Sequence, residues 1–586
     1  MRKFNKVLSL ILSAGVFVGL ASCGNKIPGN SNGGNSGTPS ESSATEDPDK
    51  TNIKLCYYNG GLRDVWIKNA IAEFENTFAD YSFESGKKGV KVSLDSAKDH
   101  RGPNYLINAK DTDFSMFMLE DVDYYEYRNK GHLASIKNVV KNKAITGVEN
   151  GQLVSSEEKT IEEKMYSDAR TYYNVNDDYY ALPFHASTLN LNYNVELFEN
   201  YGLYFAKGKT AEGMTDAELE KNLVSLFTSD LNNLSDGPDG VHGTYDDGLP
   251  ATFADMNALV KYMKVAKITP FIWTGKSNFY ITLLANAVWA DIIGADEVRS
   301  FLSLSGDADD LCTLGADGNI VYDAGKIKTV KETLKGDTAY KFHLSEGKLH
   351  ALEFIEMIFE DSKNYYFKSV NGGFTHLDAQ KFFIKGGTSQ YPNIGFLIDG
   401  SWWDSEGRDY FDTVGDKTYL KRKYGIMPIP KIDASHIGEK ETKLISCTSS
   451  VFLNSNLTGA KKTAAETFMS WLHSDKALAI FTKETAIMRE FKYALTDNDL
   501  AAMSYYGRVN YGIFNNEKVD VVAYRPLSDS AVRNASILHE QRWGFSTGKS
   551  NSVADMIYTD KMTAEQIFKA VYTYYSTNWN TIYQKS

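Results

Sequence analysis

The sequence predicts an α/β fold with at least two lobes, and three observations lead to it. The chain has 586 residues, more than a single hydrophobic core usually organises. It holds 42% hydrophobic and 24% charged residues, the balance of an ordinary globular protein. From residue 51 onward, short apolar runs alternate with amphipathic helical stretches. Such alternation favours a largely parallel sheet covered by helices.

The alternation begins with the run NIKLCYY, which predicts a strand, and the turn NGG that follows it. Residues 62–81 then place their apolar side chains on one face of a helix. The runs GVKVSLD and DFSMFMLED predict a second and a third strand. Because ligands of such sheets bind beyond the carboxyl ends of the strands, we expect ligand contacts there. The residues at the ends of the first and third strands are Tyr57, Tyr58, Asn59, Glu120, Asp121 and Asp123.

The first residues predict secretion. The basic stretch MRKFNK precedes an apolar run, Val7–Leu20, that is too short for an ordinary membrane span. We therefore expect a signal peptide over residues 1–22. The sequence LASC at its end resembles a bacterial lipobox, which implies cleavage before Cys23 and acylation of that residue. The alternative is a simple signal peptide with an incidental cysteine.

Residues 23–50 predict a flexible linker. They hold almost no apolar side chains, so they cannot bury enough surface to fold. With lipid on Cys23, this linker would hold the body of the protein in water at the outer face of the cytoplasmic membrane.

Charge and aromatic content narrow the range of partners. The net charge is -12 and no basic run follows the N-terminus, which argues against nucleic acid as a partner. Aromatic residues make up 13% of the chain and include 36 tyrosines. A surface rich in tyrosine suits stacking on polar ligands and hydrogen bonding to them.

Motifs of the common catalytic sites are incomplete or missing. The triplets Gly275–Ser277 and Gly548–Ser550 lack the upstream glycine of a phosphate-binding loop, because Pro270 and Trp543 occupy its position. The stretch HEQRW lacks the second histidine of a zinc-binding helix, and no Gly-x-Ser-x-Gly motif occurs. Neighbouring acids are unspecific in a chain with 75 of them. The sequence therefore favours binding over catalysis.

The segment YYALPFHASTLNLNYNVELFENYGL, residues 179–203, is the most informative one. It resembles the stretch that crosses between lobes in extracellular solute-binding proteins of bacterial ABC importers, in the carbohydrate-binding branch (family 1). Further motifs of that family recur in order, namely KGHLASI, GLPATFADM, GFLIDGSWW, YGIMPIP and the helix pair starting at AAETFMSWL. The matching positions in the crossing segment are Pro183, Tyr193, Asn194, Leu197, Phe198 and Gly202.

The resemblance implies a periplasmic-binding-protein-like fold, with two α/β lobes joined by a hinge and a ligand cleft between them. It implies a monomeric lipoprotein, not an enzyme, that captures an oligosaccharide and delivers it to the permease of an ABC transporter, with no cofactor required. Two alternatives stay open. One is a cell-surface glycoside hydrolase, which needs two carboxyls about 5–10 Å apart. The other is a peptide-binding lipoprotein of similar fold.

The same resemblance predicts how the chain divides between the lobes. The first lobe is expected to return late in the sequence, and the C-terminal helical segment is expected to belong mainly to the second lobe. The predicted ranges are 51–185 for the first lobe, 186–435 for the second lobe with insertions at 204–250 and 296–345, 436–498 for the return segment, and 499–586 for the C-terminal segment.

The stretch FLIDGSWWDSE, Phe396–Glu406, places two tryptophans side by side. By the resemblance, Trp402 lies at the cleft and stacks on a sugar ring, and the small Ser401 lets the ligand approach. Because side chains alternate along a strand, Trp403 is expected to point into the core unless the strand has already ended in a turn. The alternative is that both rings belong to the core.

Three further residues join the expected ligand set. His185 follows Pro183 at the expected hinge, where it is either a buried structural histidine or a contact to a sugar hydroxyl. Ser187 lies two residues further along. Trp273 lies in the apolar run TPFIWTG, where an aromatic residue is more commonly part of the core.

The stretch DGPDGVHGTYDDG offers two interpretations. Its acids, Asp236, Asp239, Asp246 and Asp247, predict a structural calcium loop, since carboxylates on tight turns suit this ion. It does not match an EF-hand, because Pro238 occupies the third position. The alternative is a solvated turn preceding the helix near Thr252, since turns rich in Gly and Asp need no metal.

Overall fold

The computed structural model describes residues 46–97, 109–120, 124–447, 449–525, 527, 544–549 and 552–583. The expected signal peptide, the expected lipidation site Cys23 and residues 24–45 of the expected linker lie outside this part of the chain. So do Asp121 and Asp123 of the expected ligand set.

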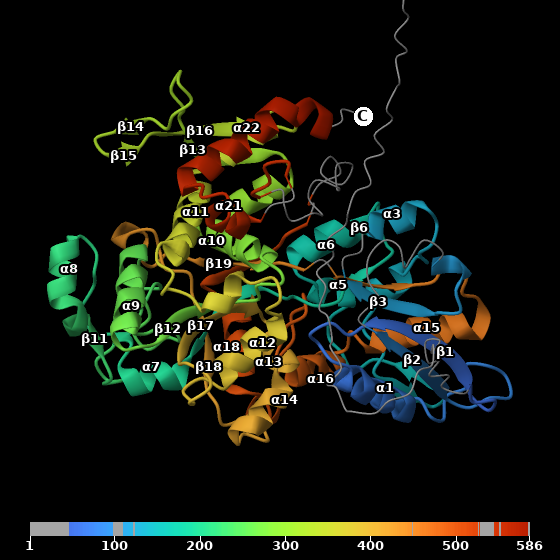
Figure 1. The fold of residues 1–586 in the computed structure, drawn as a ribbon. Helices are drawn as coiled ribbons and strands as arrows, with labels where there is room; N and C mark the ends of the chain where they lie inside the picture. The colour runs from blue at the N-terminus through green and yellow to red at the C-terminus, as the bar shows by residue number, and fades with distance from the viewer. Residues whose placement is uncertain are drawn as a thin grey trace, which may run out of the picture.

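The first lobe is built on a five-stranded sheet (Figure 1, right). Strand β1 runs parallel to β2 and β3, whereas β20 runs antiparallel to β3 and β8. Helix α1, Val65–Thr77, buries Trp66, Ile67 and Phe74 in the same hydrophobic cluster as the strands. In order across the sheet, the strands are β2 (Val90–Ala97), β1 (Thr51–Tyr58), β3 (Met116–Glu120), β20 (Ser449–Leu453) and β8 (Leu182–Pro183).

The second lobe is built on a four-stranded sheet (Figure 1, left). Strands β12 and β17 run parallel, and β9 runs antiparallel to β17 and β18. The long helix α10, Phe279–Leu302, contacts β9 and β17 and contains a non-helical residue at Gly294. In order across the sheet, the strands are β12 (Thr269–Ile272), β17 (Ile394–Gly400), β9 (Leu189–Asn194) and β18 (Tyr424–Met427).

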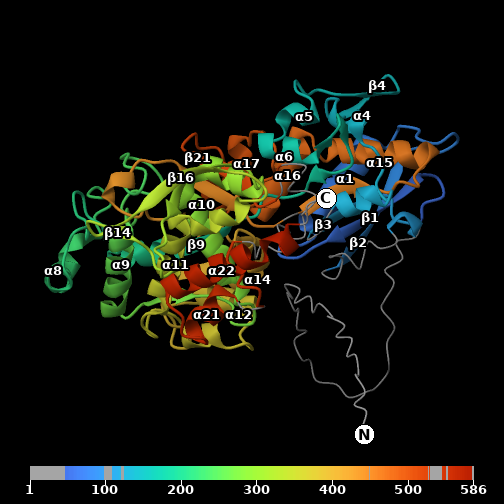
Figure 2. The ribbon, with the colours of Figure 1, turned by 90° about the horizontal axis from the view of Figure 1, so that it is seen from above.

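The chain crosses between the two sheets more than once. It leaves the first sheet after β8 and enters the second at β9. It returns to the first sheet between β19, Glu441–Ile445, and β20. The crossing segments are bonded to one another, because the amide of Ser446 donates to the Ser187 carbonyl at 2.8 Å, and that of Ala186 donates to the Met488 carbonyl at 2.9 Å. The two lobes lie side by side in the view from above (Figure 2).

Local side chains explain how the second lobe starts. Strand β9 ends at Asn194, whose side chain accepts a hydrogen bond from the Leu197 amide and so caps helix α7, Val195–Tyr201. That helix ends at Gly202, whose φ of 60° is left-handed. Gly425 of β18 leaves room for the ring of Tyr193, since a Cβ there would lie 2.4 Å from it. The Tyr-Asn pair and the glycine of the crossing segment thus have structural roles.

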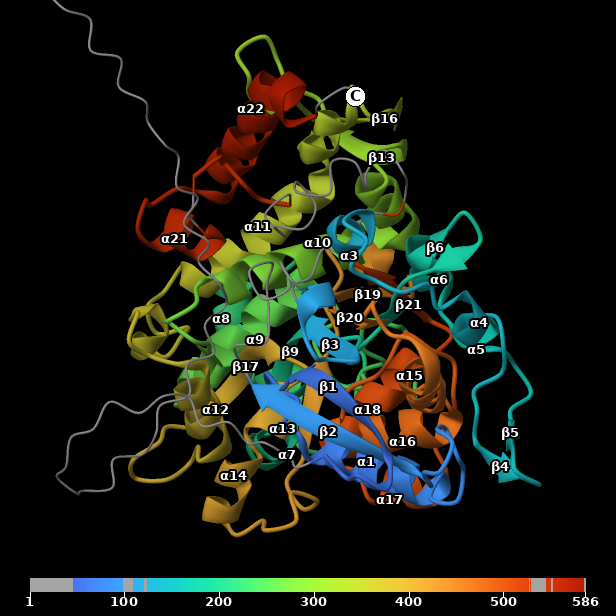
Figure 3. The same ribbon diagram turned by 90° about the vertical axis from the view of Figure 1, so that its right-hand side faces the viewer.

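Additional elements flank the second lobe. Residues 204–250 include α8, Asp216–Asn222, at its far edge (Figure 1). The hairpin of β13, Gly306–Cys312, and β16, Thr329–Leu334, extends from α10. The C-terminal helices α21, Val553–Tyr558, and α22, Ala564–Ile582, pack on α11, Glu346–Phe359 (Figure 3).

No helix in the described ranges is both long and apolar enough to cross a membrane.

Candidate functional site between the two lobes

Strand β17 ends at Gly400, so neither tryptophan lies in the strand. Ser401 and Trp402 form a turn, which we call the tryptophan turn. Helix α13, Trp403–Glu406, begins directly after Trp402. Trp403 is fully buried, and its ring lies 5.1 Å from that of Tyr424 and 5.2 Å from that of Tyr506. Trp403 therefore belongs to the core of the second lobe, because the turn directs it there and not because of strand alternation.

Trp402 is only partly buried and lies between the lobes. It packs against the main hydrophobic cluster of each lobe. A Cβ on Gly61, in the loop after β1, would lie 2.9 Å from the Cβ of Trp402. A Cβ on Gly400 would lie 2.1 Å from the six-membered ring of the indole, and the ring of Tyr280 meets the indole edge-on at 6.1 Å. Glycines on both sides therefore let this ring span the junction of the lobes.

The residues at the end of β1 differ in burial and in the hydrogen bonds of their side chains. Tyr57 is fully buried, and its hydroxyl donates to the Arg63 carbonyl at 2.7 Å and accepts from the Trp66 indole at 2.7 Å. Burial raises its pKa above the ordinary value for a tyrosine. Tyr58 is 4% exposed. The amide nitrogen of Asn59 donates to Ser96 at 2.9 Å, and its buried Oδ1 has no hydrogen-bond partner among the described residues.

Glu120, His185 and Ser187 come together where the chain crosses between lobes. The Nε2 atom of His185 lies 3.2 Å from Oε1 of Glu120 but makes no hydrogen bond of good geometry among the described residues. Its Nδ1 atom lies 2.8 Å from the Ser187 hydroxyl. The three side chains therefore form one polar line, in which the imidazole of His185 lies between the carboxylate of Glu120 and the hydroxyl of Ser187.

Ser401 connects this crossing to the tryptophan turn. Its amide donates to the Thr188 carbonyl at 2.8 Å, and its hydroxyl accepts from the Thr188 amide at 3.3 Å. Trp273, by contrast, lies in the core of the second lobe beside Phe359 and Tyr365, with no exposed surface. Tyr57, Tyr58 and Trp273 are thus packed inside the lobes. His185 and Ser187, by contrast, lie in the segment that connects the lobes, with Glu120 beside His185, Ser401 bonded to the same segment and Trp402 packed against both lobes.

Four residues outside the expected ligand set lie next to the tryptophan turn. Gln380 of α12, His376–Ile384, donates to both Asp399 and Glu406, the acids on either side of the turn. His376 lies 3.2 Å from Glu406. Burial and the charge of Glu406 raise the pKa of Asp399 to about 7. The acids flanking GSWW were the only signal in the sequence, since α12 is distant along the chain.

The acidic loop forms a capped turn, which favours the alternative to the calcium loop. Asp239 accepts from the Val241 amide at 2.7 Å, and Asp247 accepts from the Gly243 amide at 2.8 Å. Asp246 accepts from the Asp239 amide at 3.0 Å, and burial raises its pKa to about 6. Asp236 faces His242 at 3.3 Å. Within the described ranges, no three His, Cys, Asp or Glu side chains are arranged to hold a metal ion.

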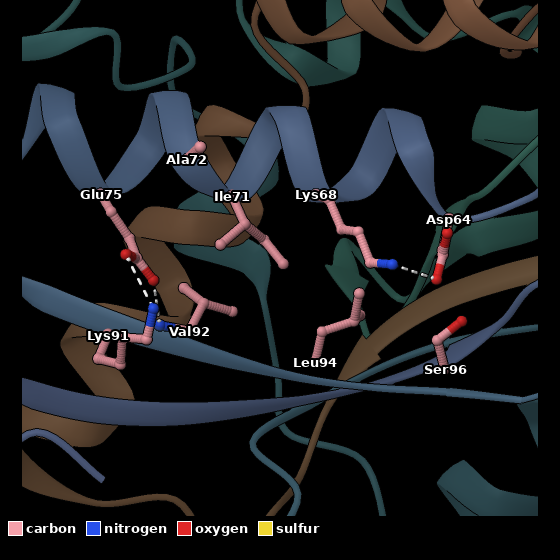
Figure 4. Close-up of a pocket in the computed structure, with 9 residues that line it drawn as sticks. All are labelled: Asp64, Lys68, Ile71, Ala72, Glu75, Lys91, Val92, Leu94 and Ser96. Carbon is pink, nitrogen blue, oxygen red and sulfur yellow. Dashed lines mark hydrogen bonds and ion pairs between the residues drawn. The ribbon is translucent and has the colours of Figure 1, made fainter. Parts of the chain in front are cut away.

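A groove of about 410 Å³ lies between α1 and the edge strand β2 (Figure 4). Ion pairs lie near its two ends, Asp64 with Lys68 at 2.7 Å and Glu75 with Lys91 at 3.2 Å. Its floor is aliphatic, and Ser96 at one end is the partner of Asn59. It has no aromatic lining, so it lacks the stacking surface that Trp402 provides at the junction of the lobes.

Comparisons with known proteins give the fold. No family model matches the chain, and no curated protein matches it. The structure of maltose-bound MalE3 of T. maritima aligns over 89% of this chain and 98% of its own, with a TM-score of 0.50 and 14% identity. The bacterial solute receptor AcbH aligns over 91% of this chain and 100% of its own, with a TM-score of 0.51 and 12% identity. The expected periplasmic-binding-protein-like fold is thereby confirmed.

Proposed function

We propose that the protein is a lipid-anchored extracellular solute-binding protein that captures an oligosaccharide between its lobes and delivers it to an ABC permease. The observation that carries this proposal is Trp402, a partly buried indole that contacts the hydrophobic clusters of both lobes. An aromatic ring at the junction of two lobes suits a ligand that both lobes enclose.

The polar groups around this ring suit the hydroxyl groups of a sugar. The C–H face of a sugar packs on an aromatic ring, while its hydroxyls need fixed donors and acceptors. Asn59 offers an Oδ1 that has no hydrogen-bond partner among the described residues, and His185 places Nε2 beside the carboxylate of Glu120. Ser187 and Ser401 complete the proposed ligand set, whereas the rings of Tyr57, Tyr58 and Trp273 are packed in the cores and are left out.

The solved structures support a sugar as the ligand. The MalE3 structure holds maltose, and the AcbH receptor has an exclusive preference for β-D-galactopyranose. For this chain we propose a ligand of several sugar units, an oligosaccharide.

Anchoring and delivery complete the proposal. A lipid on Cys23 and the linker that follows would hold the lobes at the outer face of the cytoplasmic membrane as a monomer. Closure of the lobes around the sugar would create the form that docks on the permease.

Isothermal calorimetry of the purified protein against a panel of oligosaccharides tests the binding. Binding of at least one sugar that Trp402→Ala weakens, with no new reducing ends after hours of incubation, would support the proposal. Release of reducing ends that is lost in Glu120→Gln would replace it with a glycoside hydrolase. Binding of peptides and of no sugar would replace it with a peptide-binding lipoprotein.

A further inference from the structure

The tryptophan turn is held at both ends by one side chain. The Nε2 group of Gln380 donates to Oδ2 of Asp399 at 3.0 Å and to Oε2 of Glu406 at 3.0 Å. Asp399 lies just before Gly400-Ser401-Trp402, and Glu406 ends the short helix that follows. An amide NH₂ has two hydrogens, so this one group can satisfy both carboxyls. We call Gln380, Asp399 and Glu406 the carboxyl clamp.

The clamp lies in a nearly dry environment. Gln380 has no exposed surface, Asp399 is 1% exposed, and the side chain of Glu406 is 7% exposed. The other oxygen of Asp399 accepts from the Gly400 amide at 2.7 Å. The clamp therefore ties both ends of the turn that carries Trp402 to α12, in addition to the bonds between Ser401 and Thr188.

Two negative charges that share one amide are costly in such a place, because burial disfavours each charge and the two carboxylates repel one another. His376 beside Glu406 offsets this effect on Asp399 only in part, since the charge of Glu406 acts on Asp399 more strongly. A single proton on the pair removes the repulsion. Burial and the charge of Glu406 raise the pKa of Asp399 to about 7, while His376 beside Glu406 lowers it. Three tyrosines also lie within reach of the clamp charges, which help to raise their pKa values; they are Tyr280 of α10, Tyr410 of α14 (Arg408–Phe411) and Tyr506 of α18 (Tyr505–Phe514).

We propose that the carboxyl clamp makes sugar binding at Trp402 depend on one proton, which the Asp399–Glu406 pair holds in the binding-competent state. When the proton is present, the turn is closed and the indole is held in place for stacking. When it is lost, repulsion between the carboxylates loosens the turn. This inference rests on the proposed function, and the clamp residues act as positioning residues that need not touch the sugar.

The test is the pH dependence of sugar affinity in the whole protein, measured by calorimetry with the tightest-binding oligosaccharide of the panel. Loss of one required proton with a pKa near 7 weakens binding by about tenfold between about pH 6 and about pH 8. Asp399→Asn keeps the shape of the carboxyl but cannot ionise, so its affinity should stay constant over this range. Glu406→Gln removes the neighbouring charge, so the midpoint should move to lower pH.

A matched control is Asp246→Asn, which removes another carboxyl of raised pKa in the acidic loop of the same lobe. This variant should keep the wild-type pH profile, and thermal melts at each pH show that every variant is folded. A flat wild-type profile, or a slope that persists in Asp399→Asn, overturns the clamp. If Asp399→Asn does not fold, an unchanged midpoint in Glu406→Gln overturns it as well. Absence of sugar binding at every pH overturns the proposed function itself.

Discussion

Replacing each of the two adjacent tryptophans by alanine should separate binding from stability. Trp402 lies between the lobes and is partly exposed, whereas Trp403 has no exposed surface and packs among Phe383, Phe411, Tyr424 and Tyr506. The two substitutions remove the same number of atoms from neighbouring positions. Any difference between them therefore reports the place of each ring and not its size.

The expected losses of stability and of sugar affinity follow from where each ring lies. Trp403→Ala leaves a cavity in a well-packed aromatic cluster, which should cost about 3–5 kcal/mol of folding free energy. Trp402→Ala leaves no closed cavity, so it should cost less stability. Loss of one stacking contact is worth about 1–3 kcal/mol, by analogy with bases stacked on aromatic side chains. Sugar affinity should therefore fall about tenfold to a hundredfold in Trp402→Ala.

Calorimetric titration with the best oligosaccharide and thermal melts of both variants provide the assay. The expected result is weak binding with near-normal melting for Trp402→Ala, and early melting with retained affinity below the transition for Trp403→Ala. The reasoning is refuted if Trp402→Ala binds like the wild type and melts early, because the partly exposed ring would then be structural.

Three further predictions concern the junction, the anchor and the acidic loop. Gly61→Ala should weaken sugar binding, since its Cβ would lie 2.9 Å from Trp402. Gly86→Ala is the matched control, because Gly86 also has a left-handed backbone but no neighbour within 4 Å of an added Cβ. Equal sugar affinities in the two variants would contradict the contact between Gly61 and Trp402. Cys23→Ala should release a folded protein from membranes, and a variant that still fractionates with salt-washed membranes would show another anchor. A chelator should leave the melting temperature unchanged, because Asp239 and Asp247 are bonded to amides of the loop itself. If a chelator lowers the melting temperature of the wild type but not that of Asp239→Ala, the calcium hypothesis is restored.

The ends of the strands show how far sequence reasoning reaches into the site. It predicted that residues after β1 and β3 would lie near the ligand, and this stays a prediction; Glu120 lies 3.2 Å from His185 of the crossing segment, and Asn59 is bonded to Ser96. It could not distinguish Asn59 from Tyr57, because nothing local reveals that the Tyr57 hydroxyl finds Arg63 and Trp66 as partners. A hydroxyl at a strand end is equally suited to a ligand and to a neighbouring helix.

The tryptophan turn shows which part of the site the sequence alone could not predict. The acids in DGSWWDSE are adjacent in the sequence, yet their shared partner Gln380 is in α12 and carries no motif. Burial and the charge of Glu406 make the pKa of Asp399 unusual, and burial depends on elements from several parts of the chain.

The sequence by itself determined the α/β class and the order of β1, α1, β2 and β3, because these follow from hydrophobic periodicity. Only the tertiary structure decided that Trp402 lies between the lobes while Trp403 is buried, and that Ser187, His185 and Glu120 form one line. Those facts depend on where the chain crosses between the two sheets, and contacts between residues hundreds of positions apart leave no periodic pattern in a single sequence.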